Sequence, residues 1–266
     1  MNQTRPAIAL TIAGSDSGGG AGIQADLRSF AAFGVHGTCV ITAVTAQNTC
    51  RVSGIHVVPA SNLRAQLDAV LADFRVGAIK IGMLATPMIA RVVADVLIGR
   101  PSIPVILDPV LVATTGAKLA RGDLAAALRK HLLARATLLT PNIPEAERLL
   151  DRKIGTTRDM HAAAVALLDQ GSRAVLLKGG HLRGNEVSDL LLTKDGEHWF
   201  HKKRFRGQYH GTGCSLSAAI AAGIARGDTL DVAVEQAIGF VHDALAAGYR
   251  PGKGALRVLD HLAAAR

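Results

Sequence analysis

Near its start the chain carries a continuous apolar run and then a glycine-rich loop, Ala7-Ile8-Ala9-Leu10-Thr11-Ile12-Ala13 and Gly14-Ser15-Asp16-Ser17-Gly18-Gly19-Gly20-Ala21-Gly22. The apolar run is typical of a buried strand in a parallel sheet, and a helix is expected from about residue 23 to 33. No GxxxxGK[ST] is present, and the nearly unbroken glycines do not fit GxGxxG, which excludes P-loop and dinucleotide-binding sites. The loop instead offers bare backbone against which a flat ligand can lie.

Apolar strand-like runs and helix-like segments alternate along the remaining sequence. Further strands are expected at residues 40–46, 78–84, 103–110, 136–140 and 174–178, and helices at 61–74, 85–98, 124–133, 158–170, 211–224 and 230–247. Residues 187–192 and 198–203 alternate in polarity and predict a short antiparallel edge with a turn at Lys194-Asp195-Gly196. The pattern predicts one doubly wound α/β domain over residues 1–266, with a mostly parallel sheet flanked by helices.

Composition narrows the class of protein. Of the 266 residues 49% are hydrophobic, enough for a substantial core, while only 3% are aromatic, which disfavours base-stacking nucleic-acid binding. The net charge of +9 comes from scattered basic residues, the densest run being residues 201–206. The first apolar run is too short to span a membrane, and three cysteines without a CxxC suit a reduced compartment. We therefore expect a cytoplasmic protein that binds neither nucleic acid nor membrane.

Polar residues follow the predicted strands at the edge where α/β proteins bind ligands. They are Asp16, Gln47, Asp108, Asn142, Glu145 and Lys178. The carboxyl ends of parallel strands meet at one edge of the sheet, so these groups are expected to lie close together. Acids there can hold Mg²⁺ through water and a lysine can neutralise phosphate. The set therefore predicts phosphoryl transfer.

A second glycine motif, Gly211-Thr212-Gly213-Cys214, begins a predicted helix. The free N–H groups of a first helical turn and the helix dipole favour a bound anion. The same position favours a thiolate at Cys214. Alone, the motif is equally compatible with a glycine-bearing turn before a core helix.

These motifs together resemble the ribokinase-like superfamily and, within it, the hydroxymethylpyrimidine/phosphomethylpyrimidine kinases. The matching stretches, in chain order, are Ala13-Gly14-Ser15-Asp16, Gly19-Gly20-Ala21-Gly22-Ile23-Gln24-Ala25-Asp26, Val40-Ile41-Thr42-Ala43, Ala46-Gln47-Asn48-Thr49, Lys80-Ile81-Gly82-Met83-Leu84, Asp108-Pro109-Val110, Thr140-Pro141-Asn142, Pro144-Glu145-Ala146, Lys178-Gly179-Gly180-His181 and His210-Gly211-Thr212-Gly213-Cys214. They span nearly the whole chain.

The resemblance implies ATP-dependent phosphorylation of 4-amino-5-hydroxymethyl-2-methylpyrimidine, and then of its monophosphate, in thiamine biosynthesis. It implies that Gln47 reads the aminopyrimidine, with Gly14, Asp26, Met83 and Val110 around the ring. Asn142 and Glu145 would position phosphate and Mg²⁺, Lys178 would contact the ATP phosphates, and Gly211, Thr212 and Gly213 would form the anion hole. Cys214 would take the position of the catalytic base, where related sugar kinases carry Asp. Homodimerisation is expected from the family alone.

Several readings stay open at the level of sequence. Asp26 can bind a ligand or complement the helix dipole, Asp108 can bind metal or cap a turn, and Met83 can line a pocket or fill the core. A pyridoxal or pyridoxine kinase, or a dual enzyme, would carry the same motifs because those rings also bear a hydroxymethyl group. A non-catalytic binding relative is the third reading, disfavoured by the intact motif at 211–214 and by Lys178. The C-terminal Gly252-Lys253-Gly254-Ala255 matches the family's glycine-rich pattern only loosely.

Overall fold

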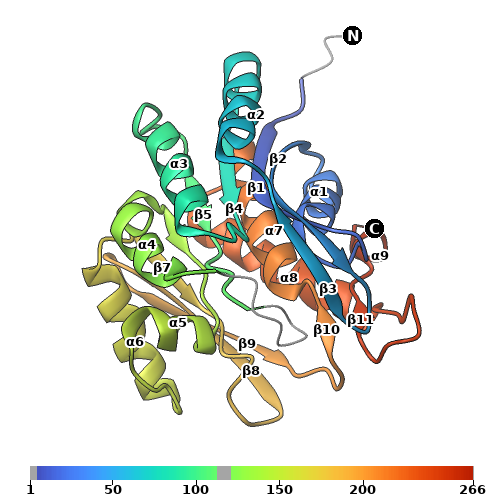
Figure 1. Ribbon diagram of the computed structural model, residues 1–266. Coiled ribbons are helices and arrows are strands. Elements are labelled where there is room, and N and C mark those ends of the chain that lie inside the picture. The colour runs from blue at the N-terminus through green and yellow to red at the C-terminus, as the bar shows by residue number, and fades with distance from the viewer. Residues whose placement is uncertain (1–4, 113–120, 266) are drawn as a thin grey trace.

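The computed structural model describes residues 5–112 and 121–265, and within them one large sheet organises the molecule (Figure 1). Its nine described strands stand in the order β3-β2-β1-β4-β5-β6-β7-β8-β9. They are β1 (Ile8–Asp16), β2 (His36–Gln47), β3 (Val52–Val57), β4 (Ala78–Ile81), β5 (Val105–Leu107), β6 (Leu138–Leu139), β7 (Ala174–Leu177), β8 (Glu186–Thr193) and β9 (Glu197–Lys203). Pairs from β2 to β7 are parallel, whereas β3 and the β8–β9 hairpin pair antiparallel at opposite edges.

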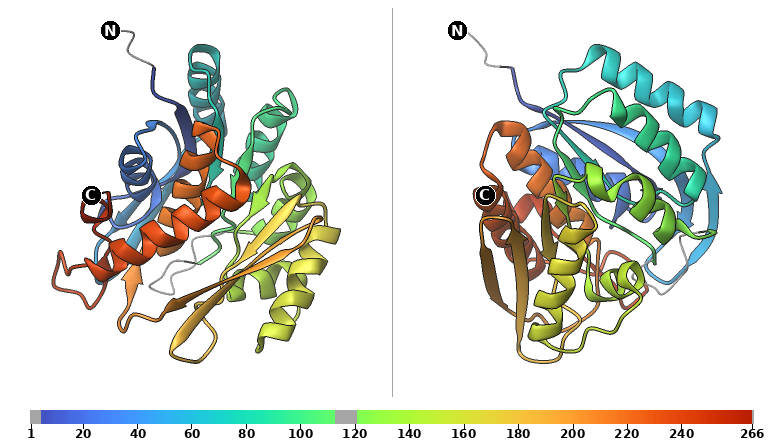
Figure 2. Two further views of the ribbon diagram at one scale, coloured as in Figure 1. Left: turned by 180° about the vertical axis from the view of Figure 1, so that it is seen from behind. Right: turned by 90° about the vertical axis from the view of Figure 1, so that its left-hand side faces the viewer.

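Helices cover both faces of this sheet (Figure 2). They are α1 (Gly22–Ala32), α2 (Ala60–Asp73), α3 (Pro87–Ile98), α4 (Leu124–His131), α5 (Ile143–Leu150), α6 (Thr157–Asp169), α7 (Thr212–Arg226), α8 (Leu230–Ala246) and α9 (His261–Ala264). Side chains of α2 to α6 form one apolar core against the sheet, and those of α1, α7 and α8 form a second core on its other face. Strands buried on both faces explain the continuous apolar runs of the sequence.

The alternating α/β pattern predicted from the sequence is confirmed, including the antiparallel edge, which extends to Glu186–Thr193 and Glu197–Lys203. Four elements were not predicted: β3, α5, and the strands β10 (Tyr209–His210) and β11 (Arg257–Val258), which form a small parallel pair. The expected fourth strand, 103–110, is reduced to Val105–Leu107. Pro104 and Pro109 flank this strand, and neither has a backbone N–H to donate to the ladder.

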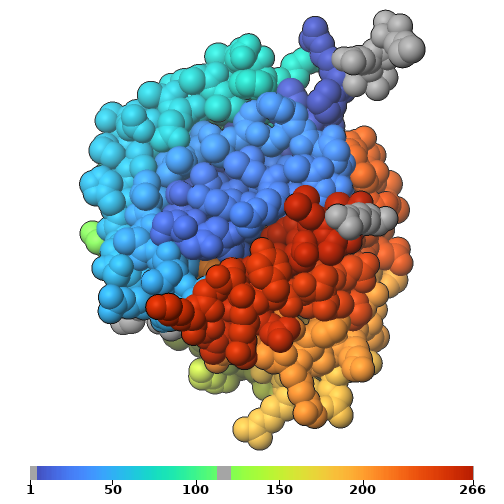
Figure 3. Space-filling model, turned by 90° about the vertical axis from the view of Figure 1, so that its right-hand side faces the viewer, coloured from blue at the N-terminus to red at the C-terminus, as the bar shows by residue number. Residues whose placement is uncertain are grey.

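The order in which strands are added to the sheet changes direction at β1. From β1 the chain runs outward to β2 and β3, then returns to place β4 on the opposite side of β1. Such a switch point opens a crevice at the carboxyl ends of the strands. Near this edge the C-terminal segment packs against the N-terminal part of the chain, where Gly254 N–H donates to Thr49 Oγ1 at 3.0 Å (Figure 3).

Candidate active site

A cavity of about 710 Å³ lies at the carboxyl ends of the parallel strands. All six polar strand-end residues expected to meet do line it: Asp16, Gln47, Asp108, Asn142, Glu145 and Lys178. The segment from Gly211 to Cys214 and the residues Gly14, Met83 and Val110 line it too. A volume of several hundred Å³ is the size usual for small-molecule sites. The polar strand-end residues therefore do meet at one cavity, which is the candidate site.

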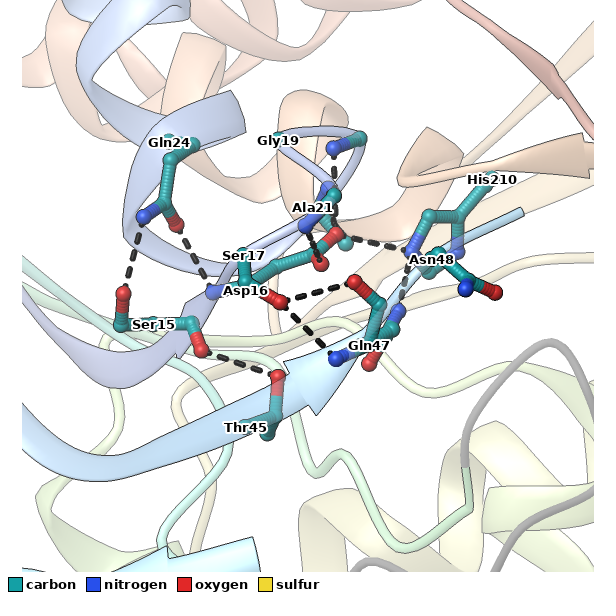
Figure 4. A network of polar contacts seen from close by, with 12 residues as sticks. Ser15, Asp16, Ser17, Gly19, Ala21, Gln24, Thr45, Gln47, Asn48 and His210 are labelled. Atoms are coloured by element: carbon teal, nitrogen blue, oxygen red, sulfur yellow. Dashed lines mark hydrogen bonds and ion pairs between the residues drawn. The ribbon is translucent and has the colours of Figure 1, made fainter. Parts of the chain in front are cut away.

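The glycine-rich loop after β1 is organised by the carboxylate of Asp16 (Figure 4). Oδ1 accepts the N–H of Gly18 at 2.8 Å, and Oδ2 accepts those of Gly20 and Ala21 at 3.0 and 2.9 Å. The ring Nε2 of His210 lies 3.0 Å from Oδ2. Burial alone would raise the pKa of Asp16, but the hydrogen bonds from His210 and these amides outweigh it and lower that pKa. Asp16 is therefore a structural anion at the cavity wall.

The turn that begins α7 is pressed against this loop. Gly211 has φ of 85° and caps the helix, and a Cβ on it would overlap the carbonyl oxygen of Gly20. Only glycine meets both conditions without strain. The first N–H groups of α7 have no partner within the helix and are available to an anion. Thr212 and Gly213 of this turn line the cavity.

Lys178 and Asp108 form an ion pair at the far end of the same turn, with Nζ 3.0 Å from Oδ1. A Cβ on Gly213 would lie 3.0 Å from Nζ, so the ammonium is directly beside the helix start. Burial would lower the pKa of Lys178, but the charges of Asp108 and Glu145 raise it above its usual value. Lys178 therefore stays a cation facing an anion-binding turn.

Asn142 and Glu145 form a capping box at the start of α5. The Asn142 side chain accepts the Glu145 N–H at 2.9 Å, and a Glu145 carboxylate oxygen accepts the Asn142 N–H at 2.8 Å. Burial raises the pKa of Glu145 to about 7, the Asp108 charge adds to the rise, and Lys178 opposes it. The carboxylates of Asp108 and Glu145 thus both lie near the single ammonium of Lys178. A bound cation would reduce the repulsion between these two carboxylates.

Cys214 lies half-buried in the cavity wall, where the backbone N–H of Gly22 hydrogen-bonds to its sulfur. Burial raises the pKa of this thiol to about 11, although the Lys80 charge pulls it down. Burial thus favours the neutral thiol, against the thiolate that the helix N-terminus favours. Dehydration of the sulfur outweighs the favourable charge and the amide.

A small apolar area lies at the other end of the cavity. Met83 is 7% exposed and packs with Ala43, Ala85 and Val110, so it both fills a core and lines the cavity. A Cβ on Gly14 would lie 2.9 Å from the Met83 sulfur, which keeps this position bare. The Gln47 side chain reaches the same cavity from the end of β2.

Comparison with known proteins agrees with this site. The sequence profile described as phosphomethylpyrimidine kinase matches residues 16–259. The chain belongs to the phosphomethylpyrimidine kinase family. It is 48% identical to the hydroxymethylpyrimidine/phosphomethylpyrimidine kinase of Rhizobium meliloti, covering 92% of each chain, and 43% identical to that of Streptomyces coelicolor, covering 96% and 94%. The resemblance stated from the motifs is thereby confirmed.

Solved structures share the fold. An ADP complex of Bacillus subtilis pyridoxal kinase has a TM-score of 0.89 at 31% identity over 97% of this chain and 98% of its own. Phosphomethylpyrimidine kinase from Clostridium difficile has a TM-score of 0.78 at 38% identity, covering 87% and 96%. The ribokinase-like α/β class expected for the family is confirmed. Within residues 5–112 and 121–265, no helix combines the length and apolar character needed to cross a membrane.

One site expectation taken from the family needs correction in this structure. Asp26 does not line the cavity: its side chain is fully buried, and its carboxylate lies 2.9 and 3.0 Å from Lys80 Nζ and 2.5 Å from Thr11 Oγ1. The side chain in contact with the cavity is Lys80. Asp26 therefore acts from behind the wall, as the counter-charge of Lys80. The Asp26 charge holds the pKa of that lysine above its usual range despite burial.

Other cavity residues were not named as site residues: Lys80 stands in a stretch that matches the family but was given no role, and the others come from elements without a recognisable motif. They are Lys80, Asp189, Arg204, Phe205, Tyr209, Ile238, Val241, His242 and Leu245. A lysine inside the apolar run of β4 was the one available signal, since a buried charge needs a partner. Arg204 donates to the carbonyl oxygens of Gly184, Leu182 and Glu186 at 2.8, 2.7 and 3.2 Å, and so ties down the loop that carries His181. The loosely matching segment 252–254 packs against Thr49 and does not line the cavity.

Proposed function

We propose that this cavity phosphorylates 4-amino-5-hydroxymethyl-2-methylpyrimidine and then its monophosphate, with the ring held near Gln47 and the ATP phosphates near Lys178. The predicted activity, an ATP-dependent hydroxymethylpyrimidine/phosphomethylpyrimidine kinase of thiamine biosynthesis, is confirmed by the family. One observation carries the site assignment. Within four residues the chain passes from His210, 2.7 Å from the Gln47 amide, to Gly213, beside the Lys178–Asp108 pair.

The ring end combines an apolar wall with one amide. Met83 and Val110 offer apolar surface, Gly14 leaves room for a flat ring, and the Gln47 amide can exchange a hydrogen bond with a heteroaromatic ring. Such a pocket fixes the ring plane and leaves the hydroxymethyl group to point along the turn at Gly211. This directs the reacting oxygen toward the phosphate end.

The phosphate end neutralises charge rather than forming covalent bonds. Lys178 would bind the ATP phosphates, and Asn142 would help to place them. The N–H groups of Gly211, Thr212 and Gly213 would stabilise the phosphoryl group in transfer. A loose transition state needs this positioning and charge stabilisation more than a strong base. The apolar residues Ile238, Val241 and Leu245, which line the cavity from α8, would contact the adenine.

Asp108 and Glu145 would hold Mg²⁺, which would supply positive charge to neutralise the phosphates. The described residues contain no cluster of three or more His, Cys, Asp or Glu side chains arranged for a metal. A site of two carboxylates still suits Mg²⁺, which is usually held by one or two carboxylates together with phosphates and water. Burial is the main cause that raises the pKa of Glu145 and the charge of Asp108 adds to it, so a bound cation beside these two carboxylates would be favourable.

Cys214 enters the reaction as a thiol, since a pKa of about 11 keeps its proton on the sulfur at neutral pH. In that state it can contact the substrate oxygen but cannot receive the hydroxyl proton. We place it as a hydrogen-bonding neighbour of the reacting hydroxyl, with proton loss late in the transfer. We further propose that residues 1–266 act as one kinase domain, in the cytoplasm and as a homodimer, as the family resemblance implies.

Pyridoxal phosphorylation is the second candidate, because pyridoxal kinases of Bacillus subtilis and Staphylococcus aureus share the fold at 31% identity. A coupled ADP-release assay with Mg-ATP should compare hydroxymethylpyrimidine, its monophosphate and pyridoxal. We expect turnover on both pyrimidines and a kcat/KM for pyridoxal at least about tenfold lower. A preference for pyridoxal would replace the substrate assignment, and no turnover on any of the three would overturn the proposal.

A further inference from the structure

His210 connects three segments of the site that are far apart in the sequence (Figure 4). Its Nε2 lies 2.7 Å from the side-chain amide nitrogen of Gln47, at the end of β2. The same nitrogen lies 3.0 Å from Asp16 Oδ2, at the end of β1. His210 itself ends β10 and directly precedes the anion-binding turn. One imidazole nitrogen therefore contacts both the ring-reading amide and the anion that organises the glycine-rich loop.

The position of this imidazole is fixed from several sides. Its side chain is buried, with only 8% of the residue exposed. A Cβ on Gly20 would lie 2.7 Å from Cδ2 of His210, so the ring packs directly on the bare backbone of the loop. Asp16 cannot move away, because three loop amides donate to its carboxylate. The ring thus has little freedom to rotate, and it transmits that rigidity to Gln47.

Gln47 needs such support. Its backbone is held in place, because the Gln47 N–H donates to Ser17 Oγ at 2.8 Å. Its long amide side chain, however, can adopt several rotamers. Because the carboxylate of Asp16 can only accept, Nε2 of His210 carries the proton, and the Gln47 amide pairs with this N–H through its oxygen once its oxygen and nitrogen positions are exchanged. A ligand-reading group held in one rotamer costs less entropy on binding than a mobile one. Loss of the contact should therefore weaken ring binding without altering the phosphate end.

We propose that His210 is a positioning residue, which, anchored by Asp16, holds the Gln47 amide in the orientation that binds the substrate ring. The inference rests on the proposed function, since it takes Gln47 to be the group that reads the pyrimidine. It adds that ring recognition depends on a histidine that need not touch the substrate. It also links the rigidity of the glycine-rich loop to selectivity for the ring.

The test is a double-mutant cycle on pyrimidine binding and turnover with Gln47→Ala, His210→Phe and the double variant. His210→Phe keeps an aromatic ring against Gly20 but removes Nε2. We expect its KM for hydroxymethylpyrimidine to rise about tenfold, the size of effect typical of one lost hydrogen bond, with the KM for ATP nearly unchanged. In the Gln47→Ala background the same replacement should have almost no further effect. His210→Gln, whose amide reaches roughly the place of Nε2, should restore most of the binding, whereas the shorter His210→Asn should not.

Arg28→Ala is the matched control for general loosening of the loop. Arg28 is an exposed side chain of α1 that supports the same loop by donating to the carbonyl oxygen of Gly19 at 2.5 Å. We expect it to leave the pyrimidine KM unchanged. Additive effects of Gln47→Ala and His210→Phe, or an equal rise in KM in Arg28→Ala, would overturn the proposal. Wild-type protein without any pyrimidine turnover would instead refute the proposed function, so the two failures are distinguishable.

Discussion

The ammonium of Lys178 lies 3.0 Å from Oδ1 of Asp108, so the ends of β7 and β5 are joined by an ion pair beside the first turn of α7. Asp108 is only 2% exposed at its side chain and Lys178 13%. Oδ1 of Asp108 also lies 3.4 Å from the Thr140 hydroxyl. This pair places one cation and one anion at the phosphate end, where the cation serves ATP and the anion serves Mg²⁺ in the proposed reaction.

Lys178→Met should lower kcat about 10²- to 10³-fold, because one charge that stabilises the transferring phosphoryl group is lost. The KM for the pyrimidine should change little, since Lys178 lies away from Gln47. Steady-state kinetics on both substrates measures the split, and Lys194→Met in the exposed turn between β8 and β9 is the control. A variant that loses pyrimidine affinity but keeps kcat would contradict the assigned role.

Glu145→Gln should stabilise the fold while harming the reaction. The pKa of Glu145 rises from 4.5 to about 7 on folding. Between pH 4.5 and pH 7, the carboxyl of the folded protein therefore keeps a proton that the unfolded chain has lost. Stability therefore falls as pH rises through this window, and the full penalty applies above about pH 7. Glutamine has no such charge, yet its carbonyl can still accept the Asn142 N–H.

Urea unfolding should show a gain for Glu145→Gln of about 3 kcal/mol at pH 8 and almost none near pH 4.5. Glu235→Gln, on the exposed side of α8, should change stability by less than about 0.5 kcal/mol at either pH. The Mg²⁺ concentration needed for half-maximal turnover should rise in Glu145→Gln alone. An equal gain at both pH values would show that charge at Glu145 is not the cause.

The grouping of the polar strand-end residues followed from the sequence because parallel strands bring their carboxyl ends to one edge. Asp16, Gln47 and Asp108 are distant in the chain, yet sheet geometry alone places them together. The pairing of Asp26 with Lys80 did not follow. It depends on how α1 lies over β1 and on β4 being the neighbour of β1, which no local pattern encodes.

The missed elements had weak or ambiguous local signals. β3 is six residues long, contains Gly54 and His56, and lies at an exposed edge, so its apolar pattern is faint. The start of α5 was interpreted as a phosphate and metal motif. The spacing of Asn142 and Glu145 is also that of a capping box, and the structure shows that it is one. Pro144 near the helix start concealed the helix further, although this is a tolerated place.

Cys214 should react slowly with iodoacetamide at neutral pH. With a pKa of about 11 its thiolate fraction at pH 7.5 is far below that of an ordinary thiol, whose pKa is about 8.5. Cys50 is exposed in the same chain and provides the internal reference. We expect alkylation of Cys214 to be at least about 100-fold slower, measured by mass spectrometry of the two peptides.

Cys214→Ser should also retain kcat within about tenfold, because a hydroxyl can replace a neutral thiol as a hydrogen-bonding group. Between pH 7 and pH 9, the pH profiles of kcat for the wild-type protein and for Cys214→Ser should have the same shape, with no inflection that depends on the thiol. Labelling of Cys214 as fast as that of Cys50, or such an inflection, would restore the thiolate base expected from the motif.

Asp26→Asn should destabilise the fold strongly, although it does not line the cavity. Lys80 and Asp26 are both fully buried, so removal of the carboxylate leaves an ammonium without a counter-charge and should cost about 3–5 kcal/mol. Combining Asp26→Asn with Lys80→Met removes both charges and should recover most of this loss. Asp68→Asn breaks an ion pair on the surface, in which the side chain of Arg64 is 55% exposed and that of Asp68 50%. This replacement should cost less than about 1 kcal/mol. Urea unfolding of the wild-type protein and the three variants gives the comparison. If Asp26→Asn costs no more than Asp68→Asn, the buried pair does not stabilise this wall of the site.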